Sequence, residues 1–262
     1  QETYDITGEY YLTDLVALAR ADGGKAVAIE CAESEVAGAN SRADLAAIEA
    51  VVQNELRKKF LAQGVTMIDP KTVYFSYDTV LGKDIVIEPN VIFETGCSVE
   101  DDVEIKGFCH FEGTRIRKGA KVGPFARLRP EADIGENCHI GDFVEIKKSV
   151  IESGAKVNHL SYIGDARIGA KTNIGAGTIT CNYDGYFKSK TDIGAGAFIG
   201  SNTIIVAPCT IEDGAMTAAG SVITKKVGKN AMAVARGKQT VMDGWAEKFR
   251  EQKKALKESL KK

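Results

Sequence analysis

Membrane-spanning and strongly charged proteins are the first classes that this sequence excludes. No apolar run approaches the roughly 20 residues that a helix needs to cross a bilayer. The formal net charge of -2 provides no bulk attraction to nucleic acid or to an anionic membrane surface, so neither is an expected partner. Residues 1–5 have neither the basic nor the apolar region of a signal peptide, and they lack an initiator Met. We therefore expect a cytoplasmic segment that has been trimmed from a longer chain.

What the chain does have is a six-residue repeat of large apolar side chains. One run of the repeat comprises Leu81, Ile87, Phe93, Val99, Ile105 and Phe111, and a later run comprises Ile193, Ile199, Ile205, Ile211, Thr217 and Ile223. Small or β-branched residues usually follow four positions after these. A hexapeptide repeat of this kind is typical of a parallel β-helix, in which three repeats complete one triangular coil of about 18 residues.

The cysteines fit the same repeat and do not suggest a metal site. Cys97, Cys109, Cys138 and Cys209 occupy the slot that Val, Ala or Thr fills in other repeats. A free cysteine packs as a small hydrophobic residue, and no CxxC pair is present to favour zinc. We therefore expect packed, reduced thiols, in keeping with a reducing compartment.

The chain divides into three predicted regions. Residues 1–64 have an α/β pattern and end in a long helix, which Ser41 can cap and Gly64 can terminate. Residues 65–240 form the β-helix, and residues 241–262 form a terminal helix or tail. The fold class expected is therefore mainly β, with a small α/β segment in front.

Two shorter elements are expected within the first region. Residues 9–21 carry apolar side chains at helical spacing, and residues 25–30 have the pattern of a short strand. Much later, between the repeats, residues 178–190 form a polar insertion. Binding groups concentrate on loops that a rigid scaffold holds in place, so this insertion is a candidate part of a functional site.

Coil spacing places two cations above one another. Arg129 and Lys147 are 18 positions apart, and so are Arg127 and Glu145, so each pair is expected on adjacent strands about 4.8 Å apart. Like charges at that distance repel unless an anion lies between them. The pattern indicates a phosphate clamp of Arg129 and Lys147 with Lys188 reaching in from the insertion, or alternatively a solvated face partly neutralised by Glu145.

Only three histidines are present, and one lies close to the expected clamp. His159 follows Arg129 and Lys147 by one coil or less, where a neutral imidazole could act as a general base and a carboxylate such as Glu145 could orient it. A surface histidine without a role is the alternative. The separations among His110, His139 and His159 do not bring three nitrogens to one point, which argues against zinc.

Four motifs resemble a known enzyme family over nearly the whole chain. They are GPFARLRP (residues 123–130), GDFVEIKK (141–148), HLSYIGD (159–165) and NIGAGTITCNYDG (173–185). They look like the acetyltransferase half of the bacterial bifunctional enzymes that combine glucosamine-1-phosphate acetyltransferase and N-acetylglucosamine-1-phosphate uridylyltransferase activities. The resemblance implies a left-handed β-helix, and a homotrimer with active sites between subunits.

The resemblance also implies roles for individual residues. His159 would take a proton from the glucosamine amine, and Glu145 would orient His159. The residues implied to hold the sugar phosphate are Arg129, Lys147, Tyr162, Asn173 and Lys188. The residues implied to line the acetyl-CoA site are Ala176, Asn182, Tyr183, Ser201, Ala219 and Arg236. Each position carries the residue type that the family has there.

Residues 1–64 resemble the end of the uridylyltransferase domain of the same family, through EYYLTD (9–14) and VAGANSR (36–42). Asn40 falls where the family has a magnesium ligand, although it could equally be a neighbour of a helix cap. The chain lacks a GxGTR loop to cradle a nucleotide. The resemblance therefore implies Mg²⁺-dependent uridylyl transfer from UTP for the intact protein only.

The expected function is transfer of acetyl from acetyl-CoA to the amine of glucosamine 1-phosphate, a step toward UDP-N-acetylglucosamine. The nearest alternative is a hexapeptide acyltransferase for a different phosphorylated or nucleotide sugar. A non-catalytic solenoid with a decayed site is a further alternative, which CoA binding would distinguish.

Overall fold

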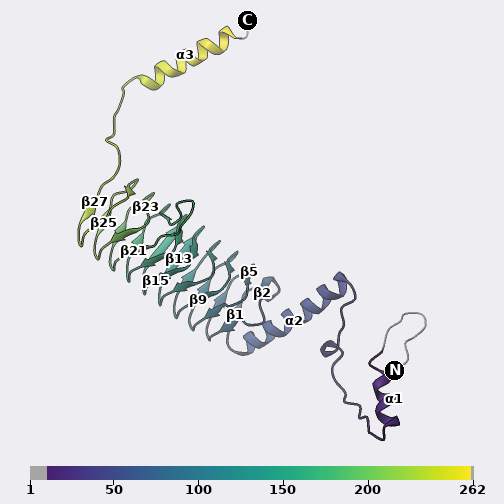
Figure 1. The fold of residues 1–262 in the computed structure, drawn as a ribbon. Helices are drawn as coiled ribbons and strands as arrows, with labels where there is room; N and C mark the ends of the chain where they lie inside the picture. The colour runs from purple at the N-terminus through teal and green to yellow at the C-terminus, as the bar shows by residue number, and fades with distance from the viewer. Residues whose placement is uncertain (1–10, 261–262) are drawn as a thin grey trace. The chain divides into compact units, whose positions relative to one another are not determined.

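A computed structural model describes residues 11–260 of the chain (Figure 1). The chain divides into two compact units, Gln1–Val52 and Gln53–Lys262. The helices are α1 (Asp14–Ala21), α2 (Arg42–Ala62) and α3 (Trp245–Ser259), and the short 3₁₀ turns are η1 (Glu33–Glu35) and η2 (Pro70–Thr72). The division between the units falls inside α2, so the domain limits expected from the sequence stay a prediction.

The long helix begins and ends close to the predicted residues. Asp44 N–H donates to Ser41 Oγ at 3.1 Å, and Asn40 N–H donates to Asp44 Oδ2 at 3.1 Å, as in a capping box. Gly64 follows α2 with φ of +96°, a conformation that favours glycine. Of the terminal helix or tail expected over residues 241–262, the structure has a helix at Trp245–Ser259, α3.

The first region differs from the sequence-based expectation. Of the helix expected over residues 9–21, Asp14–Ala21 is helical as α1 and residues 11–13 are not, and residues 9 and 10 lie outside the described residues. The strand expected over residues 25–30 does not form, and every residue in that stretch is exposed. A strand needs a hydrogen-bonded neighbour, and none of the strands within residues 11–260 pairs with this stretch.

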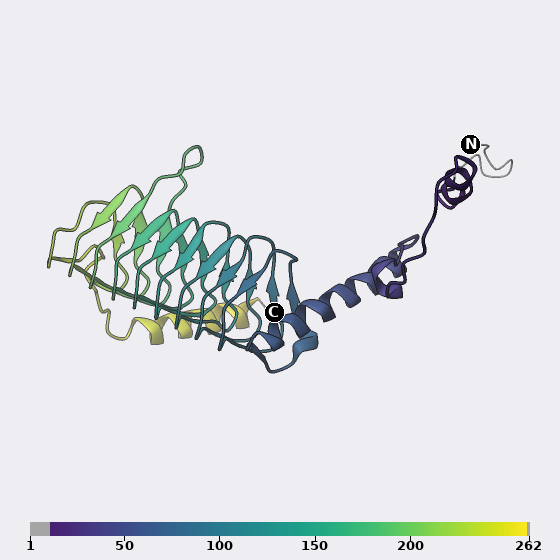
Figure 2. The same ribbon diagram turned by 90° about the horizontal axis from the view of Figure 1, so that it is seen from below.

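Residues 66–233 form a prism of three parallel sheets, which confirms the β-helix expected from the repeat (Figures 1 and 2). Sheet A contains β1 (Thr66–Met67), β4 (Val86–Ile87), β7 (Glu104–Ile105), β10 (Lys121–Val122), β13 (His139–Asp142), β16 (Lys156–His159), β19 (Asn173–Ile174), β22 (Phe198–Ile199), β25 (Met216–Thr217) and β27 (Met232–Ala233). Sheet B contains β2 (Val73–Phe75), β5 (Val91–Phe93), β8 (His110–Phe111), β11 (Arg127–Leu128), β14 (Glu145–Lys147), β17 (Tyr162–Gly164), β20 (Ile179–Cys181), β23 (Ile204–Val206) and β26 (Val222–Ile223). Sheet C contains β3 (Val80–Leu81), β6 (Ser98–Val99), β9 (Thr114–Ile116), β12 (Ala132–Ile134), β15 (Ser149–Ile151), β18 (Ala166–Ile168), β21 (Thr191–Ile193) and β24 (Cys209–Ile211).

The repeat residues fill the inside of the prism. Phe75, Phe93 and Phe111 stack in successive coils with ring centroids 5.1 and 5.3 Å apart. Each is at most 3% exposed, so burying these three rings contributes a large part of the hydrophobic stabilisation of the first coils. The four repeat cysteines are buried and free, and burial raises the pKa of the Cys109 thiol to about 12.

The last part of α2 covers the first strand of sheet B. Gln53 donates from Nε2 to Phe75 O at 2.7 Å and accepts from Phe75 N–H at 2.9 Å. Arg57 Nε donates to Val73 O at 2.9 Å, and Phe60 packs on Phe75 with ring centroids 4.7 Å apart. The helix therefore satisfies backbone groups that the end of a solenoid would otherwise leave without a β partner.

One loop leaves the prism. It lies between β20 and β21 and projects well beyond the coils in the green part of the ribbon (Figure 2). Across residues 11–260, no helix combines the length and the apolar character that crossing a membrane requires.

Candidate active site

The turn from sheet A to sheet B places several predicted site residues in one line along the prism. In the coils from Asn90 to Gly220, one residue of this turn adopts a left-handed conformation, as Leu160 does with φ of +51° and Asn202 with φ of +53°. The residue just before it faces outward at the corner. We call this line the corner column, and over five coils it consists of Asp142, His159, Ala176, Ser201 and Ala219.

Close stacking of the coils depends on glycine beside this column. A Cβ added at Gly175 would lie 2.5 Å from Ser201 N, and one added at Gly200 would lie 2.5 Å from Ala219 N. These contacts are too short for any side chain, so glycine is required at both positions for the corner column to stay in line.

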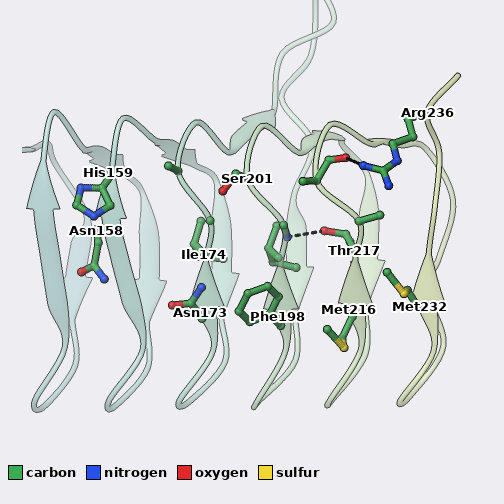
Figure 3. A pocket seen from close by; sticks show the side chains of 16 residues that line it. Asn158, His159, Asn173, Ile174, Phe198, Ser201, Met216, Thr217, Met232 and Arg236 are labelled. Carbon is green, nitrogen blue, oxygen red and sulfur yellow. Dashed lines mark hydrogen bonds between the residues drawn. The ribbon is translucent and has the colours of Figure 1, made fainter. Parts of the chain in front are cut away.

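A shallow groove of about 570 Å³ runs along the corner column on the sheet A side (Figure 3). His159 lies at one end of this groove and Arg236 lies at the other, where its Nη1 donates to Ala219 O at 2.9 Å. The predicted site residues that line the groove are His159, Asn173, Ala176, Ser201, Ala219 and Arg236. The structure therefore brings together six side chains that lie far apart in the sequence.

His159 is held by a carboxylate, but not by the expected one. Its Nδ1 lies 2.6 Å from Asp142 Oδ1 in the coil below. The hydrogen bond from His159 holds the pKa of Asp142 below its usual range. Glu145 accepts a hydrogen bond from Arg129 Nη1 at 2.8 Å. The expected contact between Glu145 and His159 is therefore corrected: Glu145 lies on sheet B, whereas His159 ends a strand of sheet A.

The predicted cation cluster lies on the outer face of sheet B. In the backbone pairing of β11 and β14, Arg127 is the register partner of Glu145. The backbone N–H of Arg129 donates to Ile146 O at 2.8 Å, so Arg129 lies beside Lys147 in the next coil, as the coil spacing predicts. Lys188 from the projecting loop lies against Lys147 and, with Arg129, holds the pKa of Lys147 below its usual range. Both neighbouring cations therefore repel Lys147, and a bound anion would relieve that repulsion.

Tyr162 lies between the corner column and these cations. A Cβ added at Gly164 would lie 2.5 Å from Tyr162 Oη and 2.8 Å from Asn182 Nδ2, so the ring and the amide cover Gly164. Gly164 is in turn the register partner of Lys147. The Tyr162 ring therefore covers part of the outer face of sheet B beside the cation cluster.

Asn182 and Tyr183 are not part of the groove. Asn182 is 8% exposed and donates from Nδ2 to Asp165 Oδ2 at 2.5 Å, which anchors the base of the projecting loop. Tyr183 is exposed, and its hydroxyl donates to Gly185 O within the same loop. Their predicted place in an acetyl-CoA site stays a prediction, and within one chain they lie on the sheet B side.

The predicted magnesium ligand stands apart from both groups. Asn40 is exposed and precedes α2, where its backbone N–H bonds Asp44. Residues 11–260 contain no group of three or more His, Cys, Asp or Glu side chains that could hold a metal ion. One exposed amide does not by itself fit the six oxygen ligands of Mg²⁺, so we assign no step to the metal here.

Asp142 is the site residue that the sequence spacing did not reveal. A uniform coil of about 18 residues would place Gly141 below His159. The coils near the site differ in length: Lys121 pairs with His139, but Asp142 rather than Gly141 pairs with His159, so the second coil is shorter by a single position. Counting the residues between the apolar positions of the Gly141 motif and those of the His159 motif could have revealed the shorter coil.

An exposed apolar ridge beside the corner column was also missed. Its members occupy the left-handed position of four successive coils and are 45–62% exposed: Phe108, Phe125, Phe143 and Leu160. The three rings stack with centroids 5.0 and 5.1 Å apart. In the coils before and after them, Asn90, Gly177, Asn202 and Gly220 fill this position, which are the residue types that tolerate it.

Comparison with known proteins gives consistent matches. Residues 112–183 match the family model described as GMPPB C-terminal domain, and residues 190–225 match that of bacterial transferase hexapeptide (six repeats). In solved structures, a UDP-N-acetylglucosamine acyltransferase from Campylobacter jejuni is similar, with 18% identity, a TM-score of 0.57, and coverage of 63% of this chain and 70% of that one. That likeness concerns the fold, the left-handed hexapeptide β-helix.

Curated relatives are much more similar in sequence. The bifunctional protein GlmU of Paramagnetospirillum magneticum is 60% identical over 95% of this chain and 56% of its own length. That of Zymomonas mobilis is 54% identical over 95% of this chain and 55% of its own length. The chain spans about half the length of these relatives. Over the half that it spans, the chain belongs to the family of the bifunctional GlmU proteins.

Proposed function

We propose that the chain transfers the acetyl group of acetyl-CoA to the amine of glucosamine 1-phosphate, giving N-acetylglucosamine 1-phosphate and CoA. The observation that carries the proposal is the position of His159, which lines the groove at the corner and is followed at once by β17, the strand of sheet B that pairs with Lys147. Acetyl-CoA would occupy the groove, and the phosphosugar would lie across sheet B over Tyr162. The relatives named bifunctional protein GlmU support this reading.

One bound phosphosugar would have to contact both the base and the cations. His159 and Tyr162 lie on the two sides of the turn at Leu160, at the end of β16 and the start of β17. In glucosamine 1-phosphate the amine on C2 and the phosphate on C1 are attached to neighbouring carbons, so the long side chains of Arg129, Lys147 and Lys188 would reach toward His159 to hold the phosphate. The amine would then lie at His159 while the phosphate lies among Arg129, Lys147 and Lys188.

The chemistry follows from these positions. The ammonium form of the amine first gives a proton to solvent by way of His159 Nε2. The free amine then attacks the thioester carbonyl and gives a second proton to His159 Nε2, so that a C–N bond forms and the C–S bond breaks. The proton on His159 then passes to the CoA thiolate. Holding amine and thioester side by side lowers the entropic cost of the reaction. The backbone N–H of Ala176, one coil beyond His159, has no protein partner in the described chain and is available to the developing oxyanion.

An acceptor comparison tests this function. Release of free CoA thiol should be rapid with glucosamine 1-phosphate and at least about 10-fold lower in kcat/KM with glucosamine, because a phosphate bound by cations contributes well over 1 kcal/mol. A chain that prefers a nucleotide sugar or a different hydroxyl or amine acceptor would be another hexapeptide acyltransferase. A chain that releases no thiol and binds no CoA would not be an enzyme of this kind.

We also propose that the active unit is a homotrimer with sites between subunits. Six of the proposed site residues line a shallow groove on the outside of the prism, and the cations lie on the outer face of sheet B, so bound ligands would be exposed to water. A neighbouring prism would complete a cleft, as acyl transfer without competing hydrolysis requires. The exposed ridge beside the corner column offers an apolar surface for that contact.

The ridge gives this proposal a direct test. Replacing Phe125 and Phe143 together with Asn, the residue found at Asn90 and Asn202, keeps a side chain that suits the left-handed backbone. We expect the sedimentation coefficient to fall toward that of a monomer and turnover per chain to fall with it. Tyr77→Asn, at an exposed tyrosine away from the ridge, is the control. A double variant that sediments and turns over as the parent does would contradict the role of the ridge.

Two further proposals concern the intact protein. We place it in the bacterial cytoplasm, which supplies acetyl-CoA and keeps thiols such as the exposed Cys31 reduced. We also propose that the intact protein carries out Mg²⁺-dependent uridylyl transfer from UTP, which the resemblance of residues 1–64 to the end of that domain supports. Addition of UTP and Mg²⁺ to the chain itself is expected to give no UDP-N-acetylglucosamine.

A further inference from the structure

We infer that Asp142 is a positioning residue for His159: it fixes the ring so that Nδ1 carries the proton and Nε2 faces the bound amine. The inference rests on the proposed function, and it assigns to Asp142 the part that sequence reasoning gave to Glu145. The observation behind it is the 2.6 Å contact between His159 Nδ1 and Asp142 Oδ1.

The contact is determined by the backbone. Asp142 ends β13 and His159 ends β16, and the two are register partners in the parallel pairing of these strands. Both therefore lie in the corner column, one coil apart, with side chains that leave the prism in the same direction. The separation of 2.6 Å falls in the range of charge-assisted hydrogen bonds.

The chemistry of the two groups determines which nitrogen holds the proton. An ionised carboxylate only accepts hydrogen bonds, so Nδ1 must donate and Nε2 keeps its lone pair. The lowered pKa of Asp142, caused by the hydrogen bond from His159, keeps that carboxylate ionised at neutral pH. A general base needs a free lone pair aimed at its substrate, and this arrangement provides one.

The other ionisable groups near His159 do not compete for Nδ1. On the strands packed against β16, β13 carries His139 and Asp142, whereas β19 begins with Asn173, which does not titrate. Lys156 lies at the start of β16 itself. Across the corner, Tyr162 covers Gly164, and Glu145 bonds Arg129. Arg236 lies at the far end of the groove and donates to Ala219 O.

An ordinary surface ion pair is the competing explanation, since the side chains of His159 and Asp142 are 60% and 38% exposed. Such a pair would contribute little to stability and nothing to turnover. The inference predicts a different pattern: a small effect on the melting temperature and a large effect on kcat. It also predicts a change in the state of the ring that can be observed without any turnover.

The test compares Asp142→Ala with Asp142→Asn in the thiol-release assay. Asp142→Ala should lower kcat by about 10- to 100-fold, the usual effect of removing the group that orients a functional histidine, with KM for both substrates nearly unchanged. Asp142→Asn should restore most of kcat because its amide oxygen still accepts from Nδ1–H.

The second readout is the ¹⁵N spectrum of histidine-labelled protein, with the His159 signals identified by their loss in His159→Gln. In the parent chain and in Asp142→Asn, Nε2 should be the unprotonated nitrogen, and in Asp142→Ala both tautomers should be populated. Glu94→Gln is the matched control, because Glu94 lies 3.4 Å from His110 Nε2 away from the corner column. It should change neither kcat nor the His159 signals.

Two results would overturn the inference. One is an Asp142→Ala variant with parental kcat. The other is a variant that loses turnover while His159 keeps the parental tautomer, which would indicate a structural effect. If the parent chain transfers no acetyl group, the proposed function fails, and the spectra still decide whether Asp142 sets the state of the ring.

Discussion

Replacing His159 with Gln is expected to lower kcat of acetyl transfer by about 1000-fold, within the range that general base catalysis contributes. The glucosamine amine is largely protonated at neutral pH and cannot attack a thioester until it loses that proton. Gln is similar in size but cannot accept the proton. The thiol-release assay at saturating acetyl-CoA and glucosamine 1-phosphate measures the effect directly.

Folding should not change in this variant. The His159 side chain is 60% exposed, and its hydrogen bond goes to a side chain rather than to the backbone. The melting temperature should therefore stay within a few degrees of the parent, and KM for acetyl-CoA should stay similar. His139→Gln, at an outward-facing histidine on sheet A, is the control and should turn over normally. Turnover of His159→Gln near the parental rate would remove His159 from the mechanism.

Replacing Lys147 with Met is expected to raise KM for glucosamine 1-phosphate by about 10- to 100-fold, which corresponds to the roughly 1.5–3 kcal/mol of a hydrogen bond between charged groups. Activity with glucosamine, which has no phosphate, should change little. The preference for the phosphorylated acceptor should therefore largely disappear. Steady-state kinetics with both acceptors at two salt concentrations measure this, and the remaining preference should weaken as salt increases.

The same substitution should not destabilise the free chain. Lys188 and Arg129 hold the pKa of Lys147 below its usual range, so folding disfavours the charged amine. This unfavourable contribution is present at pH values below the folded-state pKa and fades as pH rises through it toward the unfolded value. The melting temperature of Lys147→Met should thus equal or exceed that of the parent near neutral pH, and the difference should narrow at alkaline pH.

Lys171→Met removes the same charge from an exposed lysine in the turn before β19 and provides the control. This control variant should leave KM for both acceptors, and therefore the preference for the phosphorylated acceptor, unchanged. If Lys147→Met binds glucosamine 1-phosphate as well as the parent does, or if it melts several degrees lower, the cations of sheet B would be a structural feature and not a phosphate site.

The sequence predicted the scaffold because one short pattern specifies it many times over. Each inward residue of the repeat, such as Phe93 or Ile105, meets a similar residue in the coils above and below, so the apolar spacing determines the coil. The same regularity placed Arg129 beside Lys147. The local strand prediction for residues 25–30 was wrong because these β-type residues have no neighbouring strand. A strand depends on pairing that local sequence does not encode.

The site was harder to predict because it depends on small differences in coil length. The coil that ends at His159 is shorter by a single position than the one before it, which puts Asp142 below His159 where an even spacing would put Gly141. Side-chain direction added a second difficulty: Glu145 and His159 are near in sequence, yet a corner of the prism directs them to different sheets. Asn182 illustrates a third difficulty, since its amide is used to anchor the loop through Asp165.

A crystal structure with glucosamine 1-phosphate and CoA bound would test most directly whether the base and the cations serve one acceptor. We expect the amine within hydrogen-bond distance of His159 Nε2, the sugar over Tyr162, and the phosphate in contact with Arg129 and Lys147. A phosphosugar bound away from these cations, or with its amine remote from His159, would contradict the account.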